Sequence, residues 1–102
     1  MSVHRVLALD FGLRRIGAAI SDPRRKIATP LEVHERRDPV QDARHYRELV
    51  QEHDVDLVVI GLPVHSDGKE SKISTQARAW GAWLAEQVSR PVTFFDERNT
   101  SL

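Results

Sequence analysis

The chain has 102 residues, with 15 basic and 15 acidic side chains, a formal net charge of zero and no cysteine. This length suits one small domain, and the neutral charge means that nucleic-acid binding would have to rest on a local basic patch. The absence of cysteine excludes disulfide bonds and thiolate metal sites. Because no apolar run approaches membrane-spanning length and no signal-peptide pattern begins the chain, we expect a cytoplasmic protein that does not enter a membrane.

A buried strand, an acid and a glycine turn come first in the chain. Residues 6–9 form a short apolar run that is typical of a strand buried on both faces, and Asp10 follows directly. Residues 15–20 alternate and predict a second strand, paired with the first as an antiparallel hairpin. A carboxylate at the C-terminal end of such a strand lies where ligands usually bind in open α/β sheets. An Asp beside a Gly is, equally, a common turn former.

The next segments predict a third strand and a first helix. Residues 27–33 suit a strand in which Pro30 indicates a sheet edge or a β-bulge. Residues 34–37 are expected to form a charged linker. Asp38 is the expected N-cap of a helix from Pro39 to about Glu52. The predicted inner face of this helix consists of Ala43, Tyr46, Leu49, Val50 and His53.

Two further strands and a second helix complete the predicted order. The apolar runs 56–61 and 92–95 predict strands, and the helix between them ends near Ser89. Right-handed helical crossovers join parallel strands, so both should lie beside the first strand and parallel to it. The predicted inner face of the helix consists of Ile73, Ala77, Trp80, Leu84 and Val88. At this spacing, Trp80 is expected in the core with Trp83 beside it, rather than on a base-stacking surface.

Three motifs resemble those of the YqgF/RuvX family, ribonuclease H-like proteins described as Holliday-junction-resolvase-like or pre-16S rRNA nucleases. The first is D-x-G-x-x-R-I-G-x-A-x-S-D, from Asp10 to Asp22. The second, GLPVHSDG from Gly61, is similar to the family's GLP-x-x-x-DG loop. The third, DERNT from Asp96, resembles its DER-x-T segment. His65 and Asn99 stand where Asn and Leu are more usual in the family.

The resemblance implies a single ribonuclease H-like domain over residues 1–102, of the α/β class. Its five-stranded mixed sheet would combine a three-strand antiparallel meander with two parallel strands and carry helices packed on it. The family continues beyond its DER-x-T segment with a helix that carries another aspartate to the metal site, whereas this chain ends at Leu102. We therefore expect a domain that is C-terminally truncated relative to the family, with one sheet face uncovered and available to form a homodimer.

The resemblance also implies a metal-dependent nuclease for structured nucleic acid, acting at the 5′ end of pre-16S rRNA or on Holliday-junction-like DNA. Such hydrolysis uses two divalent ions, here Mg²⁺ or Mn²⁺, which prefer carboxylate ligands. The catalytic and metal-binding candidates are Asp10, Asp96 and Glu97. Taken alone, Asp96 and Glu97 also suit a solvated strand end. The candidates for nucleic-acid contact are Arg14, Arg15, Arg24, Arg25, Lys26 and Arg98, although a charge run is more often a solvated face.

Two other functions compete with the nuclease. One is a catalytically impaired nucleic-acid-binding or assembly module that keeps the fold. The other is an actin- or sugar-kinase-type phosphotransferase, because the D-x-G sequence also resembles the phosphate loop of that superfamily. That architecture needs two such domains, however, and this chain has room for one. The five histidines show no H-x-x-x-H spacing and have no companion cysteine, so the sequence does not indicate a zinc site.

Overall fold

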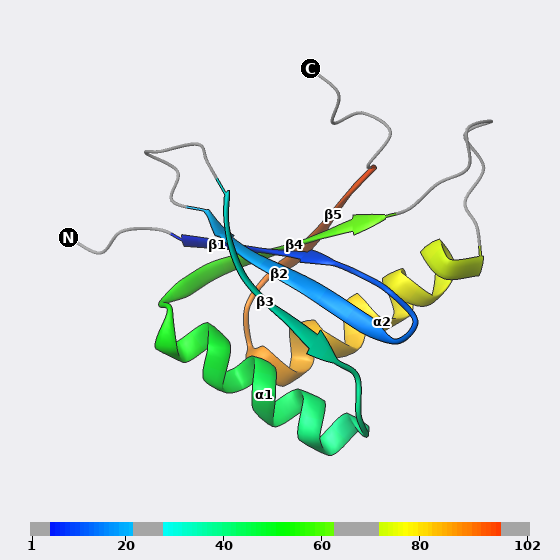
Figure 1. The fold of residues 1–102 in the computed structure, drawn as a ribbon, viewed down its shortest axis with the longest axis horizontal. Coiled ribbons are helices and arrows are strands. Elements are labelled where there is room, and N and C mark those ends of the chain that lie inside the picture. The colour runs from blue at the N-terminus through cyan, green and yellow to red at the C-terminus, as the bar shows by residue number, and fades with distance from the viewer. Residues whose placement is uncertain (1–4, 22–27, 63–71, 97–102) are drawn as a thin grey trace.

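The computed structural model describes residues 5–21, 28–62 and 72–96, and its elements follow the predicted order (Figure 1). Each predicted strand and helix is confirmed, with boundaries shifted by at most two residues. The elements are β1 (Arg5–Asp10), β2 (Arg15–Ser21), β3 (Ala28–Glu35), α1 (Pro39–Glu52), β4 (Val55–Leu62), α2 (Lys72–Val88) and β5 (Val92–Asp96).

The five strands of the described residues form one mixed sheet in the order β3-β2-β1-β4-β5. Strands β1, β2 and β3 are antiparallel neighbours, while β4 is parallel to β1 and β5 is parallel to β4. The predicted meander with two added parallel strands is therefore confirmed. Only β4 lies beside β1, however, because β2 already occupies the other edge of β1 and β5 has to extend the sheet beyond β4.

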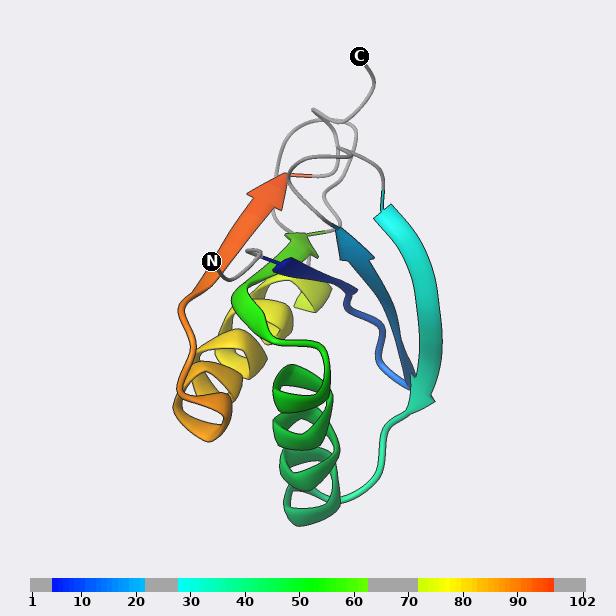
Figure 2. The same cartoon turned by 90° about the vertical axis from the view of Figure 1, so that its left-hand side faces the viewer.

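Both helices pack on the same face of the sheet (Figure 2). Helix α1 contacts α2 and β4, and α2 contacts β4 and β5. The strands alternate accordingly, since Leu7 and Leu9 of β1 are buried toward the helices while Ala8, between them, is only partly buried. On the opposite face, Val33 is 68% exposed and Phe95 is 37% exposed. We call this the open face, because no described helix covers it.

The core lies between the helices and the sheet and contains the predicted inner residues of both helices, with two differences. Ile73 is only partly buried, and His53 follows α1 as its C-cap. Among the described residues, the structure also buries two polar residues that the apolar pattern did not indicate, Asp42 and Ser74. Trp80 is buried and Trp83 is partly buried beside it, as expected. Neither described helix combines the length and apolarity needed to cross a membrane.

Strand β3 is an edge strand and contains a bulge. Ala18 of β2 pairs with Glu32 and Ala19 pairs with Pro30, so Leu31 is the extra residue on β3. Both alternatives considered for Pro30 are therefore confirmed. The charged linker expected over residues 34–37 is wrong in its first half, because β3 continues through residues 34 and 35, which pair with β2. Sheet pairing, which composition does not report, decides the end of this strand.

Candidate functional site

Asp10 lies at the C-terminal end of the central strand β1, between two glycines. Its Cα pairs with Gly17 of β2 on one side and Gly61 of β4 on the other. The same row continues outward to Val33 of β3 and Phe95 of β5. Because side chains at paired positions share a face, Asp10 projects from the open face with no side chain on either neighbouring strand beside it.

A shallow groove of about 330 Å³ lies over this row. It reaches from Phe95, past Asp10 and Gly17, to Val33 and Pro30. Its volume is at the lower end of the range found for small-ligand sites. The Asp10 side chain is exposed, and among the described residues its carboxylate has no hydrogen-bond or ion-pair partner. The groove therefore offers free carboxylate oxygens to an incoming group.

The turn that follows Asp10 is held from outside by Arg36. The Arg36 guanidinium donates to the carbonyl oxygens of Gly12, at 3.3 Å, and Leu13, at 3.1 Å. It also lies 5.0 Å from the centre of the Phe11 ring, which is buried in the core. A Cβ on Gly12 would overlap the carbonyl oxygen of Arg15, so the turn requires glycine at this position. Together these contacts fix the backbone next to Asp10.

The other acidic candidates are only partly within the described residues. Asp96 is the last residue of β5, where its Cα pairs with Leu62 of β4. The C-terminal ends of β1, β4 and β5 therefore meet at one edge of the sheet, with β1 and β5 about 10 Å apart across β4. Glu97 lies outside the described residues, as does the GLP-x-x-x-DG loop after Leu62.

The basic candidates divide in the same way. Arg14 and Arg15 are described and exposed. Arg15 lies two residues before Gly17 on β2, so it is on the open face and about 7 Å along the strand from the Asp10 row. Arg24, Arg25, Lys26 and Arg98 lie outside the described residues. Within the described part, Arg15 is thus the basic candidate on the same face as Asp10.

The carboxylate of Asp10 fits a magnesium- or manganese-type ion. These ions prefer carboxylate oxygens and keep several water molecules, so an exposed carboxylate with free oxygens in an open groove is a suitable ligand. A complete site needs further carboxylates at the same edge of the sheet. The β5 end at Asp96 is the described backbone from which they could come.

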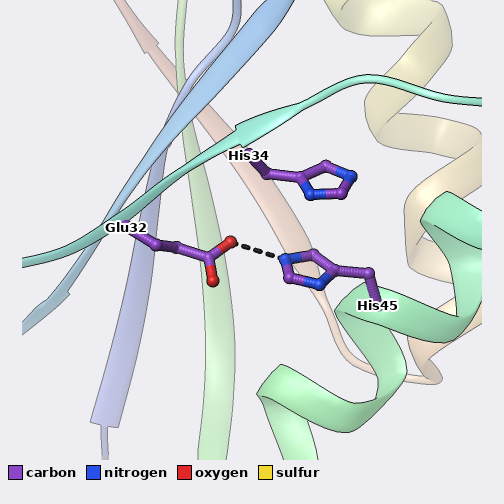
Figure 3. A group of neighbouring side chains, drawn as sticks. All are labelled: Glu32, His34 and His45. Carbon is purple, nitrogen blue, oxygen red and sulfur yellow. Dashed lines mark hydrogen bonds and ion pairs between the residues drawn. The ribbon is translucent and has the colours of Figure 1, made fainter.

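A second group of polar side chains lies between β3 and α1, on the helix-covered face, and the sequence did not indicate it (Figure 3). Glu32 and His34 point from β3 toward His45 of α1, and one ligand atom from each lies within 4.8 Å of the others. His45 Nε2 is 2.5 Å from Glu32 Oε2, and His34 Nε2 is 2.9 Å from Asp42 Oδ1. The pattern H-x-x-x-H does not cover these residues, whereas E-x-H on a strand followed by D-x-x-H on a helix does.

Tyr46 closes the inner side of this second group. Its ring meets the edges of His34, at 5.5 Å between centroids, and His45, at 5.0 Å. Its hydroxyl is buried and has no hydrogen-bond partner among the described residues. Burial raises the pKa of Tyr46 well above its ordinary value, and the negative charges of Glu32 and Asp42 raise it further. The phenol therefore stays neutral.

The sequence is similar to a well-populated group of proteins. The family model RuvX, described as Holliday junction resolvase, matches residues 4–102. A relative from Rhodopirellula baltica, named "Putative pre-16S rRNA nuclease", is 42% identical over 98 residues, which cover 96% of this chain and 57% of the relative. A protein of the same name from Koribacter versatilis is 39% identical over 102 residues, which cover 99% of this chain and 67% of the relative. The chain thus spans roughly three fifths to two thirds of the length of these relatives.

Solved structures agree on the fold. RuvC from T. thermophilus, in complex with a Holliday junction substrate, superposes with a TM-score of 0.62 at 14% sequence identity, covering 93% of this chain and 66% of that one. At this identity the likeness shows the fold alone, and it confirms the expected ribonuclease H-like class. With the RuvX family model matching from residue 4 to residue 102, the chain belongs to the RuvX family.

Proposed function

We propose that this protein is a metal-dependent nuclease that acts on structured nucleic acid, either at the 5′ end of pre-16S rRNA or on Holliday-junction-like DNA. The observation that carries the proposal is the exposed carboxylate of Asp10, which lies in an open groove between two glycines at the C-terminal edge of the sheet. The names of the relatives support nuclease activity on precursor rRNA. The cytoplasmic location expected from the sequence belongs to this proposal.

In this proposal, Asp10 holds Mg²⁺ or Mn²⁺ together with Asp96 and Glu97. The bound ions would lower the barrier by helping to form the attacking hydroxide and by stabilising the leaving oxygen. The chain itself fixes the position of the Asp10 carboxylate. The Arg36 clamp on the turn fixes the backbone beside Asp10, and the glycines at positions 17 and 61 leave the carboxylate accessible to a phosphate group.

The basic candidates would bind the phosphate backbone in the same proposal. Arg15 shares the open face with Asp10, and Arg14 precedes it in the turn. Phosphate contacts of this kind release counterions, so the affinity for nucleic acid should fall steeply as salt increases. Replacing Arg15 by Gln should make the salt dependence shallower by about one unit of log affinity per log salt. An affinity that does not change with salt would argue against this role for the arginines.

The open face also supports the homodimer expected from the sequence. Val33 and Phe95 are exposed there, and the sheet residues between them are largely apolar or small. Pairing of two open faces would remove this surface from water. Because the Asp10 groove lies on this face, the dimer and nucleic acid would compete for it. The dimer is part of the proposal, and its measurement is the solution mass by light scattering, without and with nucleic acid.

The experiment that tests the nuclease compares Asp10→Asn with Asp54→Asn. Both changes remove one carboxylate charge, but Asp54 precedes β4, at the opposite edge of the sheet, where its positive φ of 52° is one that Asn also tolerates. Cleavage of a labelled rRNA precursor and of a four-way DNA junction is followed with Mg²⁺, with Mn²⁺ and with a chelator. We expect cleavage by the parent and by Asp54→Asn with either ion, and none by Asp10→Asn.

Two results would contradict the proposal. Cleavage that persists in the chelator would exclude the metal requirement, and an unimpaired Asp10→Asn would exclude the site. Binding of both nucleic acids without cleavage by any variant would instead favour the alternative, a catalytically impaired nucleic-acid-binding or assembly module. The preferred substrate identifies which of the two nucleic acids this chain serves.

A further inference from the structure

The cluster formed by Glu32, His34, Asp42 and His45 has the composition of a transition-metal site. Imidazole nitrogens and one carboxylate are the ligands of many zinc sites, in which two histidines and one acid leave a fourth position open. In this cluster the ligands come from two elements. Glu32 and His34 are two residues apart on β3, and Asp42 and His45 are three residues apart on α1, so each pair projects from one face of its element.

The cluster also has a carboxylate behind one of its histidines. Asp42 is only 4% exposed, and it accepts hydrogen bonds from the backbone N–H of Arg37, at 3.0 and 3.2 Å, as well as lying 2.9 Å from His34 Nε2. A metal-binding histidine almost always donates its second ring nitrogen to such an acceptor, which fixes the tautomer. With His34 Nε2 held by Asp42, its Nδ1 remains for an ion.

The distances require only a small adjustment. A tetrahedral zinc ion with bonds of 2.0–2.1 Å holds two ligand atoms about 3.3 Å apart. The ligand atoms of Glu32, His34 and His45 already lie within 4.8 Å of one another. The two rings are stacked, with centroids 4.0 Å apart and an angle of 11° between their planes, so one ring must rotate to turn its nitrogen toward the ion. His45 has room to do so, since its side chain is 30% exposed.

The charges at the cluster favour a cation. Glu32 and Asp42 carry two negative charges when ionised, and both act on the neighbouring Tyr46 phenol. A single divalent ion balances both carboxylates and takes the position of the proton between His45 and Glu32.

The cluster can be reached from solvent. A surface cavity of about 540 Å³ is lined by His34 and His45, together with Arg37, Gln41, Arg44 and Glu48. It opens on the helix-covered side of the sheet, whereas Asp10 projects from the open face. The two sites would therefore bind independently, and they would prefer different ions, since Mg²⁺ favours oxygen ligands alone.

We propose that Glu32, His34 and His45 form a second metal site, which binds Zn²⁺ or a similar transition-metal ion and joins the edge strand β3 to helix α1. The proposal does not depend on nuclease activity. An ion here would tie the bulged end of the sheet to the helix layer, where His45 and Glu32 already make a direct contact. It would therefore stabilise the folded protein.

The test is a calorimetric titration of Zn²⁺ into the 102-residue protein with excess Mg²⁺ present. The variants are His45→Gln and Glu32→Gln, and the matched control is His53→Gln, which changes a partly buried histidine at the end of α1, outside the cluster. We expect one zinc ion per chain and unchanged binding by the control. Loss of a residue that only hydrogen-bonds to a metal ligand typically weakens metal binding roughly 10- to 100-fold. Each variant that removes a ligand should weaken zinc binding by more than this.

Spectroscopy on the parent protein keeps the test independent of how well the variants fold. Co²⁺ should give the visible absorption of a tetrahedral site, and Zn²⁺ should shift the ring proton resonances of His34 and His45 but not that of His53. Zinc should also raise the melting temperature of the parent and of His53→Gln. Failure of the parent to bind zinc, equal binding by His45→Gln, or unshifted His34 and His45 resonances would each overturn the proposal.

Discussion

Filling the space beside Asp10 should strongly lower nuclease activity while the protein stays folded. A Cβ added at Gly17 would lie 3.8 Å from the Cβ of Asp10, an ordinary van der Waals contact, so Gly17→Val fits the sheet. Replacing a glycine inside a strand should raise the free energy of unfolding by about 0.5–1 kcal/mol. The two methyl groups of valine extend about 1.5 Å further, against the Asp10 carboxylate where the groove opens.

The expected loss of activity follows from this displacement. A shift of about 1 Å in a reacting group costs on the order of 100-fold in rate, so kcat/KM for Gly17→Val should fall by at least that factor. Gly17→Ala should lose less. Ser21→Val is the matched control, because Ser21 lies on the same face of β2 but about 14 Å from Gly17, beside Val6 rather than Asp10. Urea denaturation measures stability and the cleavage assay measures kcat/KM.

Gly17→Val is expected to raise stability and to lower kcat/KM, so a general loss of folding cannot produce the predicted result. If Gly17→Val cleaves as fast as the parent while its urea midpoint is unchanged or raised, the groove beside Asp10 is not where the substrate or its ions bind. If the urea midpoint of Gly17→Val falls instead, the pairing of Asp10 with Gly17 is wrong. In that pairing a Cβ at Gly17 would lie 3.8 Å from the Cβ of Asp10, which leaves room for a side chain. Either result would refute the reasoning from the row of paired residues.

Two further predictions concern the polar residues under β3. Asp42→Ala should lower the free energy of unfolding by about 1–3 kcal/mol, because it leaves the Arg37 N–H and the His34 ring without their buried acceptor; an unchanged stability in urea denaturation would contradict this. Tyr46→Phe should raise stability by about 1 kcal/mol by removing an unpaired buried hydroxyl. Because the pKa of Tyr46 is raised above its ordinary 10.0 in the folded state, this group does not change stability with pH below pH 10.0, and it lowers stability as the pH rises further and the unfolded phenol ionises. The difference between the parent and Tyr46→Phe across that range isolates this effect from the titration of lysines, and a constant difference would show that the phenol is not buried.

The sequence was sufficient to predict the elements and their order. The apolar run before Asp10 and the helical spacing from Ala43 to Val50 are local patterns, and each reports which backbone conformation buries its apolar side chains. Asp38 followed by Pro39 located the start of α1 to the residue, since the Asp38 carboxylate accepts from the Gln41 N–H at 2.9 Å. Membership in the RuvX family and Asp10 as the first candidate also followed from short motifs.

The sequence could not predict what the elements place next to one another. The cluster of Glu32, His34 and His45 depends on the bulge at Leu31, which sets the face to which Glu32 and His34 point, and on α1 bringing His45 to Glu32. A shift of one residue would have turned both side chains to the open face. Strand register is set by pairing between segments, and no local pattern in residues 28–35 contains it.

The same distinction holds for the groove at Asp10. The motif identified the acid and the glycines as residues of interest, but only the sheet shows that Gly17 and Gly61 flank Asp10 in one row and that both helices pack on the other face. Periodicity determines whether a segment has an apolar face. Tertiary packing decides which partner covers that face and which residues stand beside an exposed carboxylate. These contacts join residues far apart in the chain, such as Asp10 and Gly61, which are 51 positions apart.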